Sequence, residues 1–120
     1  MVEEQKAPSP YELKWYVVHT FSGYEPRAKL LLEDRIRTFH MEDKFGQILV
    51  PTETVAEVVG GKKKTSQRKF FPGYIIVEMF VDEETWHLLK DTEKITGFVG
   101  GARNPRPMKE REVRRITQQM

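Results

Sequence analysis

The stretch Lys69-Phe70-Phe71-Pro72-Gly73-Tyr74-Ile75-Ile76-Val77 places two aromatic residues and a Pro-Gly break directly before an apolar run. The basic run Lys62-Lys63-Lys64-Thr65-Ser66-Gln67-Arg68 comes immediately before it. Adjacent residues of a strand point to opposite faces, so Phe70 and Phe71 cannot both enter one core. One of the two rings therefore faces solvent or a partner, which indicates recognition rather than catalysis.

Strand-forming and turn residues continue outward from this stretch in both directions. Residues 68–71 predict a strand that pairs with residues 55–59 across Gly60-Gly61 and the lysines, as a protruding basic hairpin. Residues 74–81 predict a central strand. The other expected strands are residues 15–20, 48–50 and 98–99.

Three segments carry helical signals. Ser22 and Glu25 form a capping box ahead of Pro26, and apolar residues then follow at helical spacing to Phe39. Asp82 caps a short second helix, and a third helix without a good N-cap begins near Lys109. The pattern predicts an α+β sandwich: an antiparallel four-stranded sheet flanked by helices, mainly on one face, with the basic hairpin projecting from it.

Length and composition indicate one domain of 120 residues, in which residues 1–13 form a flexible tail. The 20 basic and 18 acidic residues nearly balance, but two zones are locally basic. One is residues 62–69, with five cations and no acid; the other is residues 103–115, with six cations and two acids. Each zone is either a solvated surface or an attraction for phosphate backbones. The sequence has no cysteine, no membrane-spanning run and no signal-like start, so we expect a cytoplasmic protein.

Catalytic and metal-binding signals are weak. His19, His40 and His87 are scattered, so we expect neither a metal site nor a cofactor. The Gly60-Gly61-Lys62 sequence lacks the residue spacing of a phosphate-binding loop, and no acid pair or nucleophile elbow is present. We therefore expect no catalytic residues and no enzymatic activity.

The aromatic residues near residues 15–21 and 70–74 fit two readings, a domain core or a partner-binding pocket. A free RNA-binding module with a sheet like that of RNA-recognition motifs is a further alternative. That motif needs a basic residue before the Gly and aromatic residues for base stacking, where this chain has Pro72, Ile76 and Met79.

A series of motifs carries a family resemblance. In order they are Lys14-Trp15-Tyr16-Val17-Val18-His19-Thr20-Phe21-Ser22-Gly23-Tyr24-Glu25, Met41-Glu42-Asp43, Val50-Pro51-Thr52-Glu53, Arg68-Lys69-Phe70-Phe71-Pro72-Gly73-Tyr74, Trp86-His87-Leu88 and Thr96-Gly97-Phe98-Val99-Gly100-Gly101. From about Lys14 to Thr117 the chain closely resembles the N-terminal (NGN) domain of bacterial NusG transcription factors, and we assign residues 14–120 to such a domain.

The resemblance implies a module that binds RNA polymerase, holds the tip of the β′ clamp helices in a hydrophobic pocket and reaches across the cleft to the β subunit. Bridging the cleft would disfavour pausing. The implied pocket residues are Trp15, Phe21, Phe71, Pro72, Gly73, Tyr74 and Phe98. Within the pair of rings, we expect Phe71 to face the polymerase and Phe70 to enter the core.

The resemblance also implies weaker contacts to DNA and to the β subunit. The candidates for the β subunit or the single-stranded non-template DNA are Ser22, Gly23, Tyr24, Asp91, Thr92 and Thr96. The candidates for upstream duplex DNA are Lys62, Lys63, Lys64, Arg68 and Lys69. Family members continue into a KOW domain that binds termination factor Rho or a ribosomal protein; we expect that domain to be absent from this chain.

Overall fold

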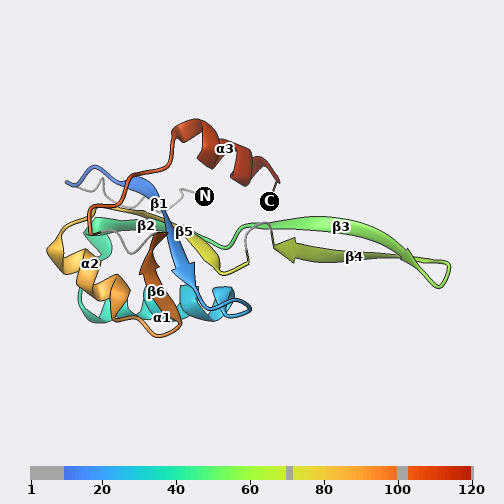
Figure 1. Cartoon of the computed structure of the whole chain (residues 1–120), viewed down its shortest axis with the longest axis horizontal. Helices are drawn as coiled ribbons and strands as arrows, with labels where there is room; N and C mark the ends of the chain where they lie inside the picture. The colour runs from blue at the N-terminus through green and yellow to red at the C-terminus, as the bar shows by residue number, and fades with distance from the viewer. Residues whose placement is uncertain (1–9, 70–71, 100–102, 120) are drawn as a thin grey trace, which may run out of the picture.

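The computed structural model describes residues 10–69, 72–99 and 103–119, and it has an antiparallel sheet at its centre (Figure 1). The four strands lie in the order β2-β5-β1-β6. Every neighbouring pair in this sheet is antiparallel. The predicted α+β fold with a four-stranded sheet is confirmed. The strands are β1 (Lys14–Thr20), β2 (Phe45–Leu49), β5 (Tyr74–Met79) and β6 (Ile95–Phe98).

The predicted hairpin projects from this sheet as β3 (Thr52–Val59) and β4 (Lys62–Lys69) (Figure 1). Its loop is shorter than expected, because Val59 pairs directly with Lys62. Gly60 and Gly61 have φ angles of +59° and +76°. A two-residue hairpin turn of type I′ requires positive φ at both positions, which glycine adopts at little cost. The lysines therefore begin the return strand instead of extending the loop.

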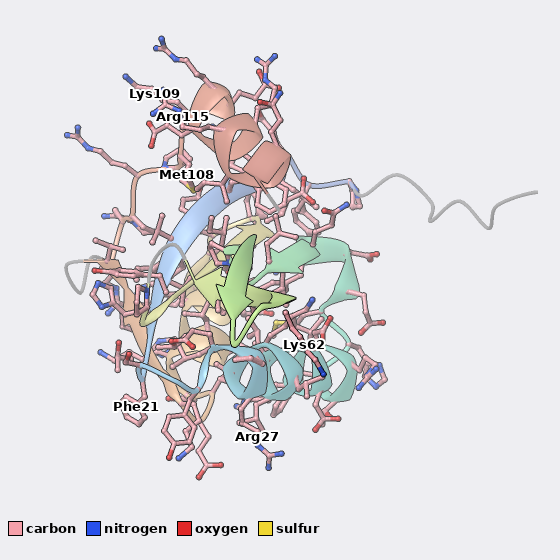
Figure 2. The ribbon with its side chains drawn as sticks, turned by 90° about the vertical axis from the view of Figure 1, so that its right-hand side faces the viewer. Phe21, Arg27, Lys62, Met108, Lys109 and Arg115 are labelled. Atoms are coloured by element: carbon pink, nitrogen blue, oxygen red, sulfur yellow. The ribbon has the colours of Figure 1, made fainter. Side chains whose placement is uncertain are left out.

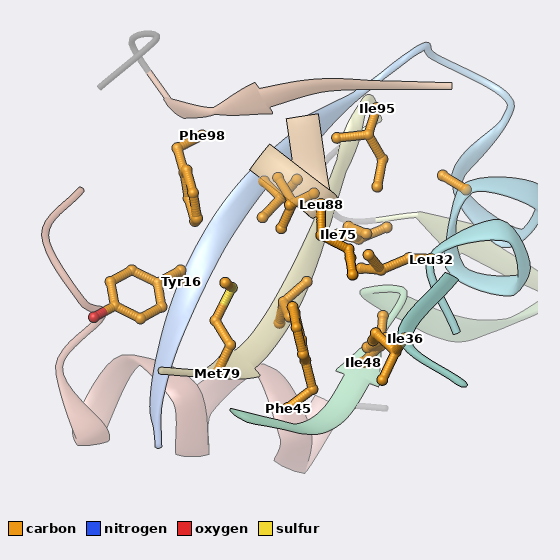
Figure 3. Close-up of a cluster of buried hydrophobic side chains, with 14 residues drawn as sticks. Tyr16, Leu32, Ile36, Phe45, Ile48, Ile75, Met79, Leu88, Ile95 and Phe98 are labelled. Carbon is orange, nitrogen blue, oxygen red and sulfur yellow. The ribbon is translucent and has the colours of Figure 1, made fainter. Parts of the chain in front are cut away.

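One face of the sheet carries the main hydrophobic core. Residues of β1 alternate, so Tyr16 and Val18 point to this face, as do Ile75, Val77 and Met79 of β5. The helices α1 (Glu25–Thr38) and α2 (Glu83–Lys90) cover it, with Leu32 and Leu89 among their buried residues. Figure 3 shows these side chains converging between the sheet and the helices.

The opposite face is covered by α3 (Glu110–Gln119), which lies across the sheet from α1 and α2 (Figure 1). Val113 and Ile116 are its buried residues. The segment before α3 is attached to the sheet, because the Met108 N–H donates to the Trp15 carbonyl at 2.7 Å. The prediction of helices mainly on one face thus holds for α1 and α2, and α3 on the other face completes the predicted sandwich.

The two predicted helix caps have different outcomes. Asp82 caps α2 as predicted: its Oδ1 accepts the Thr85 N–H at 2.8 Å, and Thr85 Oγ1 accepts the Asp82 N–H at 2.9 Å. The capping box of Ser22 and Glu25 is wrong. The N-cap position of α1 is Tyr24, without a side-chain cap. The Glu25 carboxylate is used in a longer-range contact, described below.

The remaining differences between the predicted and the observed structure lie at the ends of helices and strands. A short 3-10 turn, η1 (Glu42–Lys44), leads into β2. In the predicted tail, residues 1–9 lie outside the described part of the chain, and the Tyr11 ring packs on Phe80 with centroids 4.9 Å apart. No helix in the described ranges is long and apolar enough to cross a bilayer.

An ion pair attaches the start of α2 to η1. Lys44 Nζ lies 2.6 Å from Asp82 Oδ2, and the hydrogen bond to Asp82 raises the pKa of Lys44. Burial by itself raises the pKa of Asp82, but hydrogen bonds from Lys44 and the Thr85 N–H outweigh burial and hold it below its ordinary value. A carboxyl group with a lowered pKa in the folded state stabilises the fold above its unfolded-state pKa, and this contribution is lost as the pH falls through the folded-state pKa.

We therefore expect Asp82→Asn, which keeps a capping side chain, to lower the free energy of unfolding by on the order of 1 kcal/mol at neutral pH. The difference from the unsubstituted protein should begin to shrink as the pH falls below about 4, the ordinary pKa of an Asp carboxyl, because the unfolded chain then takes up a proton before the folded protein does. Urea unfolding at several pH values measures this. Asp34→Asn is the control, because its ion pair with Arg37 is 3.7 Å long and exposed. A difference that persists undiminished in acid would contradict the role of the ion pair.

Candidate functional site

An apolar groove lies between the sheet and the segment that leads into α3. Its volume is about 720 Å³. The sheet contributes Val17 and Ile76 to it, because β1 and β5 point alternate residues towards this face. Its full lining is Val17, Tyr74, Ile76, Val99, Asn104, Pro105, Arg106, Pro107, Met108, Lys109, Glu112 and Ile116. The groove is thus an apolar surface with charged side chains among its lining residues.

Two of the predicted pocket residues, Trp15 and Tyr74, lie on this face of the sheet. Tyr74 lines the groove, is half-buried, and packs against His19 with ring centroids 4.4 Å apart. Trp15 is half-buried and pairs with Glu78 of β5. Phe70 and Phe71 lie outside the described residues, so their division between core and partner remains a prediction.

The other predicted pocket residues are placed differently. Pro72 is exposed and Gly73 is buried in the turn just before Tyr74. Phe98 is only 4% exposed and packs edge-on against Tyr16 in the core, on the face away from the groove. Phe98 was chosen from its place in a motif, and strand alternation alone could not show which face its ring takes. Phe21 belongs to a second surface.

That second surface, which we call the aromatic tip, consists of Phe21, Tyr24 and Lys94. The two aromatic side chains are 50% and 47% exposed. Lys94 Nζ lies 4.5 Å from the Tyr24 ring centroid and 5.9 Å from that of Phe21. The Phe21 N–H donates to the Lys94 carbonyl at 3.0 Å, which joins two loops far apart in the sequence. Aromatic rings beside a cation favour contacts with a partner or with nucleobases.

The two loops of the aromatic tip and the start of β6 contain the residues predicted to contact the β subunit or non-template DNA. Ser22, Gly23, Asp91 and Thr96 are exposed. Thr92 is not available for such a contact: it is 2% exposed, and its hydroxyl donates to the Leu88 carbonyl at 2.7 Å. Lys94 lies within the stretch from Asp91 to Thr96 in which these contacts are expected.

The buried carboxylate of Glu25 connects the aromatic tip to the turn before Tyr74. Glu25 is 0% exposed. Its Oε2 accepts the N–H groups of Gly23 and Gly73, both at 2.8 Å. The Thr20 N–H also donates to the Gly73 carbonyl at 2.8 Å. One carboxylate thus determines how the loop that contains Gly23 lies relative to the turn that contains Gly73.

Gly73 is required in this arrangement for a reason of its own. Its φ angle is +84°, and a Cβ atom added there would lie 3.4 Å from the Thr20 carbonyl oxygen. Residues with a Cβ rarely adopt such a φ angle. The Pro-Gly break is therefore a structural element of the site, whatever the partner.

Among the predicted upstream-DNA residues, Lys62 is exposed beside the hairpin turn (Figure 2). Lys63, Lys64, Arg68 and Lys69 lie on β4. Elsewhere, burial and then the charge of Glu12 raise the pKa of Tyr16 above its ordinary value. In the described part of the chain, no three His, Asp or Glu side chains gather as metal ligands.

The architecture defines the class of the protein. The NGN domain of Methanocaldococcus jannaschii NusG matches 85% of this chain over 98% of its own length, with a TM-score of 0.53. At 18% identity this match shows the fold alone. A Thermotoga maritima NusG structure matches more closely, with a TM-score of 0.73 and 31% identity over 90% of this chain and 57% of that one. The sandwich with its hairpin is an NGN fold.

The family follows from sequence comparison. The family model described as transcription termination factor nusG matches residues 13–117. The transcription termination/antitermination protein NusG of Pseudomonas aeruginosa is 52% identical over 100 residues, and that of Escherichia coli K12 is 45% identical over 101. The chain belongs to the NusG family of transcription termination and antitermination factors. It spans 56% of the length of each of these two relatives.

Because the Glu25 carboxylate accepts hydrogen bonds from both Gly23 and Gly73, we expect Glu25→Ala to destabilise the fold strongly. The variant leaves two N–H groups without their acceptor, one of them buried, at a cost of about 3 kcal/mol in the free energy of unfolding. Glu25→Gln retains an acceptor oxygen and should cost less. Urea unfolding gives the values, with Glu33→Ala on the same helix as the control. Equal losses at both positions would contradict the anchoring role.

Proposed function

We propose that this domain binds RNA polymerase as an elongation factor, with the groove holding the tip of the β′ clamp helices. The observation that carries the proposal is the apolar groove itself, with Tyr74 in its lining and Trp15 on the same sheet face. A surface of this kind suits an apolar protein segment, and buried aromatic anchors dominate such interfaces. NusG membership supports polymerase as the partner.

The aromatic tip is the proposed second contact, to the β subunit or to the non-template strand. Because Glu25 and Gly73 join the tip to the turn before Tyr74, the two contacts have a defined spacing. A rigid body that binds both sides of the cleft favours the closed polymerase by its greater affinity for that state. In this proposal the domain makes and breaks no bond, and it acts in the cytoplasm with the polymerase. Rho-dependent termination and coupling to the ribosome would require a KOW domain as well.

The alternative of a free RNA-binding sheet has less support. Ile76 and Met79, at the positions where stacking aromatics would be needed, are both buried and point to opposite faces. The two positions therefore cannot form a pair of stacking residues on one face of the sheet.

The groove assignment is tested by binding to core RNA polymerase. We expect Phe71→Ala and Tyr74→Ala each to weaken binding by about tenfold, because each removes one large apolar contact at the interface. Quantitative pull-down or fluorescence titration measures the affinity. Phe39→Ala is the matched control, because Phe39 is an exposed aromatic residue at the end of α1. Unchanged binding by both variants, with intact circular dichroism spectra, would refute the assignment.

The hairpin is tested by the salt dependence of complex formation. Phosphate contacts release counterions, so replacing Lys62, Lys63 and Lys64 by Ala should flatten the dependence of affinity on salt for an elongation complex that contains upstream duplex DNA. The same variant should bind core polymerase without DNA as the unsubstituted domain does. An unchanged salt slope would assign the lysines to a solvated surface only.

A further inference from the structure

The outward side of α3 carries an arginine stripe, by which we mean Arg111, Arg114, Arg115 and Gln118. These residues follow one another at the i, i+3, i+4 and i+7 spacing of a single helix face, and together they line a shallow hollow. All four are exposed. Val113 and Ile116 point the other way, into the sheet, so packing against the sheet holds the stripe towards solvent.

The stripe is not neutralised by the protein. In the described ranges, none of its three arginines forms an ion pair, whereas Arg37 and Arg103 pair with Asp34 and Glu83. The two acids of α3, Glu110 and Glu112, precede and interrupt the stripe in sequence, and by helical geometry each lies to one side of it. Exposed Arg106 and Lys109 extend the positive surface towards the start of the helix. Figure 2 shows Lys109 and Arg115 at one end of the molecule, with Phe21 at the other.

The composition of the stripe indicates what it binds. Arginine presents a planar fork of donors that matches phosphate oxygens, and Gln118 adds a neutral donor. Proteins that bind single strands add aromatic side chains on which bases stack. The large aromatic residues that are most exposed in the described chain are Phe21, Tyr24 and Phe39, and they belong to α1 and the loop before it, across the sheet from α3. Cations without stacking rings favour the backbone of a duplex.

We propose that the arginine stripe of α3 binds the phosphate backbone of duplex DNA without sequence preference. This site is distinct from the hairpin and from the groove, and it does not depend on the proposed contact with polymerase. Each arginine reaches one phosphate, so the stripe adds about three phosphate contacts and a corresponding dependence on salt.

The test is the affinity of the 120-residue chain for a duplex of about 20 base pairs, measured by fluorescence anisotropy from about 50 to 200 mM salt. The variant R111Q/R114Q/R115Q should bind at least about tenfold more weakly at the lowest salt, and its salt slope should fall by about 2 to 3. The matched control R27Q/R37Q/K90Q removes the same charge from exposed positions on α1 and α2 and should change affinity by less than about twofold. Circular dichroism confirms that both variants are folded.

Several outcomes would overturn the proposal. These are no binding of the unsubstituted chain to the duplex, equal losses in both variants, or an α3 variant that binds as before because the hairpin carries the affinity. Tighter, α3-dependent binding of oligo-dT than of the duplex would assign the stripe to single strands. Tighter binding of poly-glutamate would assign it to an acidic protein. Loss of duplex binding with unchanged polymerase binding separates this site from the groove.

Discussion

The arrangement of both candidate surfaces depends on the buried carboxylate of Glu25. A buried carboxylate is costly unless hydrogen bonds satisfy it, and Glu25 obtains two of them from backbone N–H groups at Gly23 and Gly73. These glycines are 50 residues apart in the chain, and both have positive φ angles, so each loop presents its N–H in a conformation that other residues rarely adopt. Moving either loop would leave the charge under-solvated. Glu25 therefore ties the aromatic tip to the turn before Tyr74.

The two faces of the sheet have different roles: one packs the core and the other carries the groove. Strand alternation in β1 and β5 sends Tyr16, Val18 and Ile75 into the core under α1 and α2, and it sends Val17 and Ile76 to the other face. On that face, Val113 and Ile116 are the buried residues of α3 within the described part of the helix. A short helix that covers part of a sheet leaves an apolar groove beside it and an outward side free of packing constraints. The groove and the arginine stripe both follow from this incomplete cover.

Local patterns predicted most of the elements. The β-forming run at residues 15–20, the cap at Asp82 and the Gly60-Gly61 turn each depend on interactions within a few residues, and each is present. The predictions that differ from the structure concern contacts between residues that are far apart in the sequence. Glu25 has the right spacing for a capping box with Ser22, but its partner across the fold is Gly73. Phe98 shares a motif with surface residues, yet its ring enters the core because its strand lies against β1 with that register.

The sequence by itself determined the fold class, the projecting hairpin, the family and the two basic zones, because strand alternation, helix periodicity, turn glycines and charge are properties of neighbouring residues. It also placed Trp15 and Tyr74 among the candidates for recognition. Only the tertiary structure decided which of the candidates share a surface. Strand pairing brings β1 beside β5 and β6, the Phe21–Lys94 backbone contact builds the aromatic tip, and the packing of Val113 and Ile116 turns the arginines of α3 outward. Each of these depends on contacts between residues distant in sequence, which no local pattern encodes.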